Sequence, residues 1–208
     1  WQSGNYRFHQ FTRAGMVREV TSIWDEKGFD DVLTISRESV SVDGTVYGVP
    51  MWRDSGYGFF YNKEVWAEYG YQEPETWEEF IALGEQMQED GLTPIAIGIR
   101  HEVWKTGDWF DYLNFRINGG EWYAGLLEME ESYASEEVMQ VMETWKGLID
   151  RGFYNDDFAA LNRTEAYSKV VQGEAGMFLG GSYEVEAFED SENAGIFQFP
   201  IIDPDVPV

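Results

Sequence analysis

The chain has 208 residues, and its 39 Asp plus Glu against 14 Lys plus Arg give a formal net charge of −25. This charge makes nucleic acid a poor partner, because affinity for phosphate backbones depends on basic side chains. The sequence has no cysteine, which excludes disulfides and thiolate metal sites, and its 9 Trp, 12 Tyr and 14 Phe indicate a chain that folds around a core.

The length fits one large domain or two small ones. The chain starts at Trp1 with neither a methionine nor the pattern of a signal peptide, and it ends in a proline-rich extended segment after Pro200. We therefore expect this sequence to be part of a longer protein.

The first quarter of the chain predicts a short helix and a hairpin. A helix over residues 5–14 would carry Phe8 and Phe11 on its apolar side and would end at Gly15. Asp43-Gly44 supplies the positive backbone angles of a tight turn, so residues 42–47 are predicted to form a hairpin.

From residue 57 onward, strand and helix patterns alternate. Three helices are predicted to begin after capping residues: one after Asn62 that runs to Tyr69, one after Thr76 that stops at Gly91, and one after Ser135 that stops at Gly152. Two more helices are predicted over 109–118 and 164–172. Strands are predicted over 57–61, 94–99, 175–179 and 196–199. This alternation predicts an α/β domain with layered packing, whose ligands lie at the loops beyond the strand ends.

Three loops that follow predicted strands combine aromatic rings with polar groups. Their candidate residues are Trp52, Arg53 and Asp54, then Trp104, Asp108 and Trp109, and finally Ser182 and Tyr183. Sugars present apolar C–H faces and rings of hydroxyls, which suit flat aromatic side chains with a few convergent polar partners. Any one of these rings could instead cover the end of the sheet, but three such loops together favour a carbohydrate site.

Signals for an enzyme are weak. The sequence has no nucleophile elbow, P-loop or dinucleotide fingerprint, and we expect no cofactor and no metal. Glu184 with Glu186, or Asp108 with Asp111, could form the carboxylate pair of a glycosidase, although so acidic a chain brings carboxylates together by chance. A glycoside-active enzyme is therefore the alternative hypothesis.

Several segments, in order and over nearly the whole chain, resemble the extracellular solute-binding proteins of carbohydrate ABC importers. The segments that carry the resemblance are VDGTVYGVP (42–50), GFFYNKE (58–64), PETWEEF (74–80), PIAIG (94–98), WFDYL (109–113), ING (117–119), GFY (152–154), VQGEAGM (171–177) and FQFP (197–200). Family members are considerably longer, so the resemblance also implies that this chain is a fragment.

The resemblance implies a periplasmic-binding-protein-like two-lobe α/β fold of type II, with a sugar held in the cleft between the lobes. Residues 1–50 would belong to the first lobe and a crossing strand, 51–199 to the second lobe, and 200–208 to the return crossing. It also implies a monomer outside the cytoplasm, periplasmic or lipid-anchored, which binds a carbohydrate and delivers it to ABC permease subunits.

The same resemblance assigns roles to the candidate residues. Trp1, Gln2 and Ser3 match positions just after an early first-lobe strand, where family members contact their ligand. Ser182-Tyr183 stands where the family often has Gly-Ser-Trp. The expected stacking rings are Trp52, Trp104, Trp109 and Tyr183, and the expected partners of sugar hydroxyls are Arg53, Asp54 and Asp108.

Overall fold

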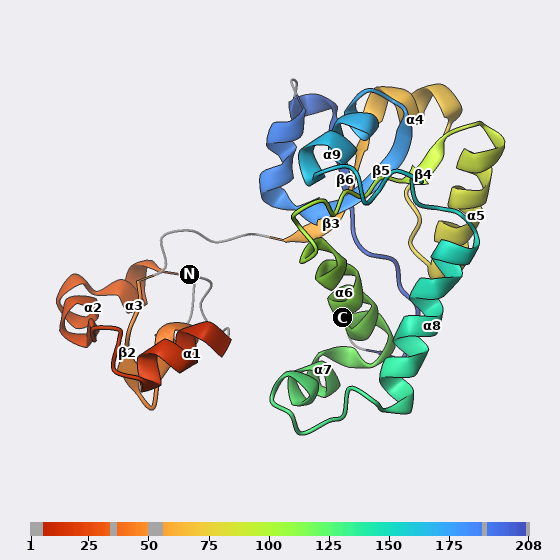
Figure 1. Ribbon diagram of the computed structural model, residues 1–208. Helices are drawn as coiled ribbons and strands as arrows, with labels where there is room; N and C mark the ends of the chain where they lie inside the picture. Colours follow the sequence, from red (N-terminus) through yellow and green to blue (C-terminus); the bar gives the residue numbers. More distant parts are fainter. Residues whose placement is uncertain (1–5, 34–36, 50–55, 189–190, 207–208) are drawn as a thin grey trace. The chain divides into compact units, whose positions relative to one another are not determined.

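The computed structural model describes residues 6–33, 37–49, 56–188 and 191–206, and the chain divides into two compact units, Trp1–Asp54 and Ser55–Val208 (Figure 1). The described parts mix helices with short sheets, so the predicted α/β class is confirmed. Each unit has its own buried apolar cluster.

The first unit is built around a hairpin and a buried tryptophan. Its described elements are α1 (Tyr6–Arg13), α2 (Thr21–Lys27), α3 (Phe29–Val32), the 3-10 turn η1 (Arg37–Val40), β1 (Ser41–Val42) and β2 (Thr45–Val46). Asp43 and Gly44 have φ values of 50° and 79°, which confirms the predicted tight turn. Trp24 is fully buried, and its Nε1 donates to Asp30 Oδ1 at 2.8 Å.

The second unit contains a four-stranded mixed sheet in the order β4 (Thr93–Ile95), β5 (Ala175–Gly181), β3 (Tyr57–Asn62) and β6 (Ala194–Phe197). β4 runs parallel to β5, whereas β3 is antiparallel to both β5 and β6. Phe59 pairs with Leu179 on one side and Phe197 on the other, which fixes the register of the sheet centre.

Helices surround this sheet. They are α4 (Lys63–Tyr69), α5 (Trp77–Glu89), α6 (Lys105–Ile117), α7 (Gly119–Leu127), α8 (Glu136–Asp150) and α9 (Arg163–Val171), with the 3-10 turns η2 (Ser182–Ala187) and η3 (Ser191–Asn193). The predicted caps at Asn62, Thr76 and Ser135 all accept backbone hydrogen bonds from the first turn of their helices, and Thr76 forms the predicted capping box with Glu79.

The two faces of the sheet bury different sets of side chains because successive strand residues point to opposite sides. Phe59 joins a cluster with residues of α5, α6 and α8, whereas its neighbour Phe60 joins a second cluster that includes Phe178 of β5 and Val170 of α9. The sheet is therefore covered on both faces, and the connecting loops lie at the ends of its strands.

Several elements differ from the sequence prediction, and two of them show why. The strand expected over 94–99 is shorter. After Ala96, whose N–H still donates to the Met177 carbonyl of β5, the chain turns to the segment after α8: Ile97 N donates to the Asn155 side chain (Oδ1) at 2.8 Å and Ile99 N to the Phe158 carbonyl at 3.0 Å. Helix α7 was not predicted, because glycine occupies both its first turn and its interior and weakens the helical pattern.

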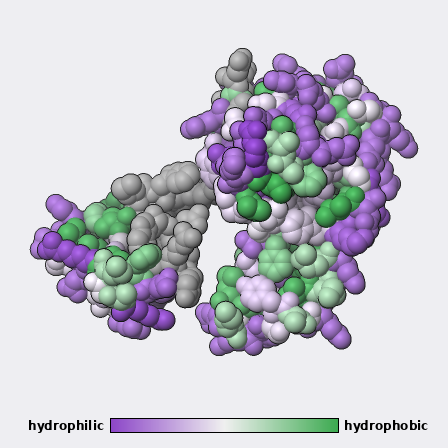
Figure 2. Space-filling model, in the orientation of Figure 1, coloured by the Kyte–Doolittle hydropathy of each residue, from purple (hydrophilic) through white to green (hydrophobic). Residues whose placement is uncertain are grey.

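Much of the surface visible in Figure 2 is hydrophilic. Hydrophilic residues gather along the outer side of α5 and α8 in Figure 2, in keeping with the acidic composition. In the described part of the chain, no helix combines the length and the apolar character that crossing a membrane requires.

Candidate functional site

The candidate site of the second unit lies at one edge of its sheet. The parallel strands β4 and β5 end at this edge, and the antiparallel β3 begins there, because Tyr57 pairs with Gly181. The segments that adjoin these strand ends bring together the start of α6, the start of α9 and the η2 turn. Ligands of open α/β sheets bind at this kind of edge.

Helix α6 begins four residues earlier than predicted, at Lys105. Residues 105–108, expected to be a loop, form the first turn of this helix, and Trp104 is its N-terminal boundary residue. The Trp104 side chain is half exposed, at 50 %, so its ring is accessible from solvent.

Trp109 lies in the core rather than on the surface. It is 2 % exposed, and its ring packs against Phe59, Tyr154 and Phe199 with centroid distances of 5.5, 5.5 and 5.8 Å. A position five residues after Trp104 on a helix lies on a different face, which here is the buried one. Trp109 therefore offers no stacking surface in this structure, in contrast to the sequence expectation, and we leave it out of the proposed site.

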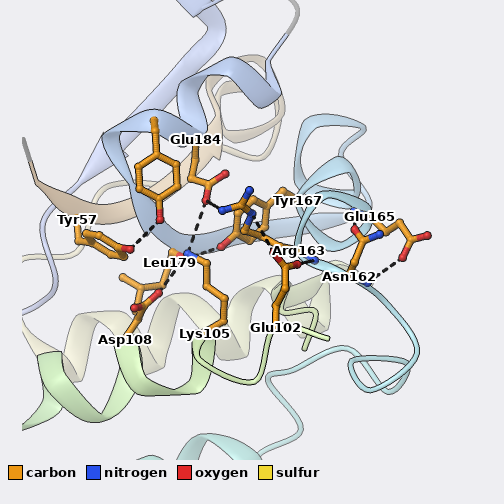
Figure 3. Close-up of polar contacts among 11 residues, drawn as sticks. Tyr57, Glu102, Lys105, Asp108, Asn162, Arg163, Glu165, Tyr167, Leu179 and Glu184 are labelled. Carbon is orange, nitrogen blue, oxygen red and sulfur yellow. Dashed lines mark hydrogen bonds and ion pairs between the residues drawn. The ribbon is translucent and has the colours of Figure 1, made fainter. Parts of the chain in front are cut away.

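Lys105 was not among the predicted site residues, yet its ammonium group lies at the centre of the site. Its side chain is 3 % exposed, and Nζ lies 3.1 Å from Asp108 Oδ2 and 3.6 Å from Glu184 Oε1. Figure 3 shows Lys105 reaching from α6 toward Glu184, with Asp108 beside it. Asp108, one of the predicted hydroxyl partners, is thus placed at the site and held by this lysine.

A second cation reaches Glu184 from the start of α9. Arg163 Nη1 lies 3.2 Å from Glu184 Oε1, and the Arg163 backbone N–H donates to Glu102 Oε2 at 2.9 Å. Burial raises the pKa of the Glu184 carboxyl above its ordinary value, while the charges of Lys105 and Arg163 act against that rise. For Arg163, burial alone would lower the pKa, and the carboxylates of Glu184 and Glu102 raise it above its ordinary value.

Tyr183 and Ser182 sit at the end of β5, where the sequence placed them. The Tyr183 hydroxyl is 2.7 Å from that of Tyr57, and the Ser182 backbone N–H donates to the Gly56 carbonyl at 2.9 Å. Both side chains are partly exposed. We call the group formed by Tyr57, Glu102, Trp104, Lys105, Asp108, Arg163, Tyr167, Tyr183 and Glu184 the Lys105 cluster.

The remaining predicted contact residues, Trp1, Gln2, Ser3, Trp52, Arg53 and Asp54, lie outside the described residues. Of the eleven predicted residues, the structure therefore brings together Trp104, Asp108, Ser182 and Tyr183 at the sheet edge. Lys105 and Glu184 are each adjacent in sequence to a predicted contact residue, and this adjacency was the one sign that they belong to the site. A single sequence does not show, however, that a charged residue is buried.

The carboxylates considered for a glycosidase have other partners here. Glu184 is bound to two cations while Glu186 is exposed, and Asp111 accepts a hydrogen bond from the Tyr123 hydroxyl at 2.5 Å. Over the described ranges, no group of three or more acidic or histidine side chains is arranged to hold a metal ion.

The chain belongs to the family of bacterial extracellular solute-binding proteins, whose family model matches residues 1–208. The family resemblance predicted from the sequence is thereby confirmed.

Individual relatives agree with this family. The chain is 25 % identical over 180 residues to an uncharacterized ABC transporter extracellular-binding protein of Pyrococcus horikoshii. The aligned region covers 86 % of this chain and 40 % of that protein. It is 24 % identical over 173 residues to a probable sugar-binding periplasmic protein of Rhizobium meliloti, with coverages of 82 % and 41 %. The chain thus spans about two fifths of the length of these curated relatives, which are named as binding proteins and not as enzymes.

Solved structures match over a similar share. A bacterial solute receptor described as preferring β-D-galactopyranose exclusively is 30 % identical with a TM-score of 0.77, and the match covers 98 % of this chain and 52 % of that one. A chitin oligosaccharide binding protein is 26 % identical with a TM-score of 0.83, with coverages of 94 % and 50 %. A protein from a study of xylan utilization in Caldanaerobius polysaccharolyticus is 25 % identical with a TM-score of 0.87, with coverages of 96 % and 52 %.

Proposed function

We propose that the protein is the substrate-binding component of an ABC importer and captures a sugar or oligosaccharide, with the sheet edge of the second unit as one wall of the sugar site. The observation that carries the proposal is the half-exposed Trp104 ring, which lies 4.8 Å from Lys105 Nζ, the same charged group that lies 5.8 Å from the partly exposed Tyr183 ring. An apolar ring face next to convergent polar groups is the arrangement that a sugar requires.

In this proposal each exposed group has one task. Trp104 and Tyr183 stack on the C–H faces of the sugar, and Asp108, already oriented by Lys105, accepts hydrogen bonds from hydroxyl groups. Trp1, Gln2, Ser3, Trp52, Arg53 and Asp54 supply further contacts. The names of the relatives support carbohydrate as the ligand class and membrane permease subunits as the partners. We further propose that the protein acts as a monomer outside the cytoplasm and is not an enzyme.

A thermal-shift screen of the intact protein tests the ligand class. Galactose, chitobiose and xylotriose are compared with two non-sugars, a tripeptide and spermidine. A ligand that binds only the folded state raises the melting temperature by mass action, by an amount that corresponds to about 2.7 kcal/mol at a hundredfold excess over Kd. We expect at least one sugar to raise it and neither non-sugar to do so.

The opposite pattern contradicts the proposal: a shift with the tripeptide or spermidine and none with any sugar. The same samples are analysed by chromatography after incubation. Intact oligosaccharides are expected, whereas cleavage that is lost in a Glu184→Gln variant would establish the glycosidase alternative.

A further inference from the structure

The Lys105 ammonium is surrounded by aromatic rings as well as carboxylates. Nζ lies 4.8 Å from the ring centroid of Trp104, and 5.3, 5.7 and 5.8 Å from those of Tyr57, Tyr167 and Tyr183. All four distances are within the roughly 6 Å over which a ring face attracts a cation. The rings come from different elements, so one charge links the start of α6 with β3, α9 and η2.

Stability alone gives no reason for this burial. Removing an ammonium and its carboxylate partner from water costs free energy, and replacing such a pair by apolar residues is often neutral or stabilising. The geometry here is imperfect as well: among the described residues, Glu184 Oε1 and Arg163 Nε have ion-pair partners, Arg163 Nη1 at 3.2 Å and Glu102 Oε1 at 3.9 Å, but neither atom makes a well-aligned hydrogen bond. The cluster therefore keeps its charges at a cost, at the edge where the proposed ligand binds.

Lys105 is also placed behind the proposed binding surface and not on it. Only 3 % of the residue is exposed, whereas the Trp104 ring in front of it is half exposed. The Tyr57 and Tyr183 hydroxyls, which lie 2.7 Å apart, tie two of the surrounding rings to each other. An ammonium in this position can orient the rings but has almost no surface of its own to offer a sugar.

We propose that Lys105 is a positioning residue that holds the Trp104 and Tyr183 rings in the orientation that binds sugar. This inference rests on the proposed function, since it assigns those rings to the ligand. The lysine attracts a face of each of the two rings before the ligand arrives. It thereby removes part of the entropy cost of ordering these side chains on binding. Glu184 and Asp108 balance its charge and fix its location.

The test uses the intact protein labelled with 5-fluorotryptophan, so that ¹⁹F NMR reports each indole without any ligand. The Trp104 resonance is assigned from its loss in a Trp104→Phe variant. The test variants are Lys105→Met and the double variant Lys105→Met/Glu184→Gln. The second substitution removes the Glu184 carboxylate, which would otherwise be buried without the charge of Lys105. The control is Lys146→Met, which removes an exposed lysine of α8 and changes the net charge by the same amount as Lys105→Met.

Each protein is then titrated with galactose, chitobiose and xylotriose. We expect both Lys105 variants to shift or broaden the Trp104 resonance and to weaken binding of the tightest sugar by about tenfold, which corresponds to about 1.4 kcal/mol. Lys146→Met should retain the wild-type resonance and affinity.

An unmoved Trp104 resonance together with an affinity within about twofold of wild type would overturn the role of Lys105 and leave the proposed function standing. Conversely, a wild-type protein that binds none of the sugars defeats the proposed function, and the Trp104 resonance of the variants then decides by itself whether Lys105 orients that ring.

Discussion

Two tryptophans five positions apart on the same helix have opposite environments. Trp104 is half exposed at the start of α6, and Trp109 lies against the central strand β3 through Phe59. Sequence alone gave both the same role, because each stands in a polar, glycine-containing stretch. The difference depends on where the helix begins, and α6 has no side-chain capping hydrogen bond at Trp104 to mark that start.

This contrast gives a prediction at the residue scale. Trp109→Ala should lower the free energy of unfolding by about 3–5 kcal/mol, because it leaves a cavity in the core, whereas Trp104→Ala should stay within about 1 kcal/mol of wild type. Urea denaturation followed by circular dichroism measures both. Equal destabilisation by the two substitutions would show that the Trp104 ring is part of the core.

Charged residues of the site were harder to predict than aromatic ones. A ring next to a strand end is visible in sequence, but the burial of Lys105 depends on groups as distant along the chain as Arg163 and Glu184. Only the fold brings these together. Of the residues that the structure brings together at the candidate site, Trp104, Asp108 and Tyr183 were therefore predicted as contact residues, whereas Lys105 was not.

At the scale of elements, local signals were reliable where a side chain satisfies the backbone. The capping box that begins α5 is an example: Glu79 Oε2 accepts from the backbone N–H groups of Glu75 and Thr76 at 2.8 and 3.1 Å. Such contacts depend on residues three or four apart, so a single sequence shows them. Strand β4, by contrast, ends early because of pairing with a segment some sixty residues away, which no local pattern shows.

The capping box also predicts a pH dependence. The two backbone hydrogen bonds lower the pKa of Glu79 from its ordinary value near 4.5, so the folded state favours the carboxylate. This contribution is complete above the ordinary pKa and is lost as the pH falls through the lowered one. In urea denaturation between about pH 6 and about pH 3, Glu79→Gln should therefore lose less stability on acidification than wild type.

The neighbouring substitution Glu78→Gln is the matched control for this experiment. It removes one carboxylate from the same helical turn, but the described contacts of the capping box do not involve it. An acid dependence of Glu79→Gln that equals that of wild type would mean that the capping box does not contribute to stability.

At the scale of the whole molecule, the family and the α/β architecture were predictable because they rest on many segments spread over the entire chain. The family model matches all 208 residues, and the second unit holds the sheet and the helices that build one side of the proposed site. The net charge of −25 argues against nucleic acid as a partner but does not describe the site, where Lys105 and Arg163 lie among carboxylates and rings.

The central claim is that this chain contributes the sheet edge around Trp104 to a carbohydrate site, and calorimetric titration of the intact protein with its tightest-binding sugar tests it most directly. Wild type and Trp104→Ala are compared under identical conditions. The account predicts that the substitution weakens binding by about tenfold or more, since aromatic rings that a partner covers on binding carry much of the energy of such contacts. An affinity for the sugar that is unchanged in Trp104→Ala would contradict it.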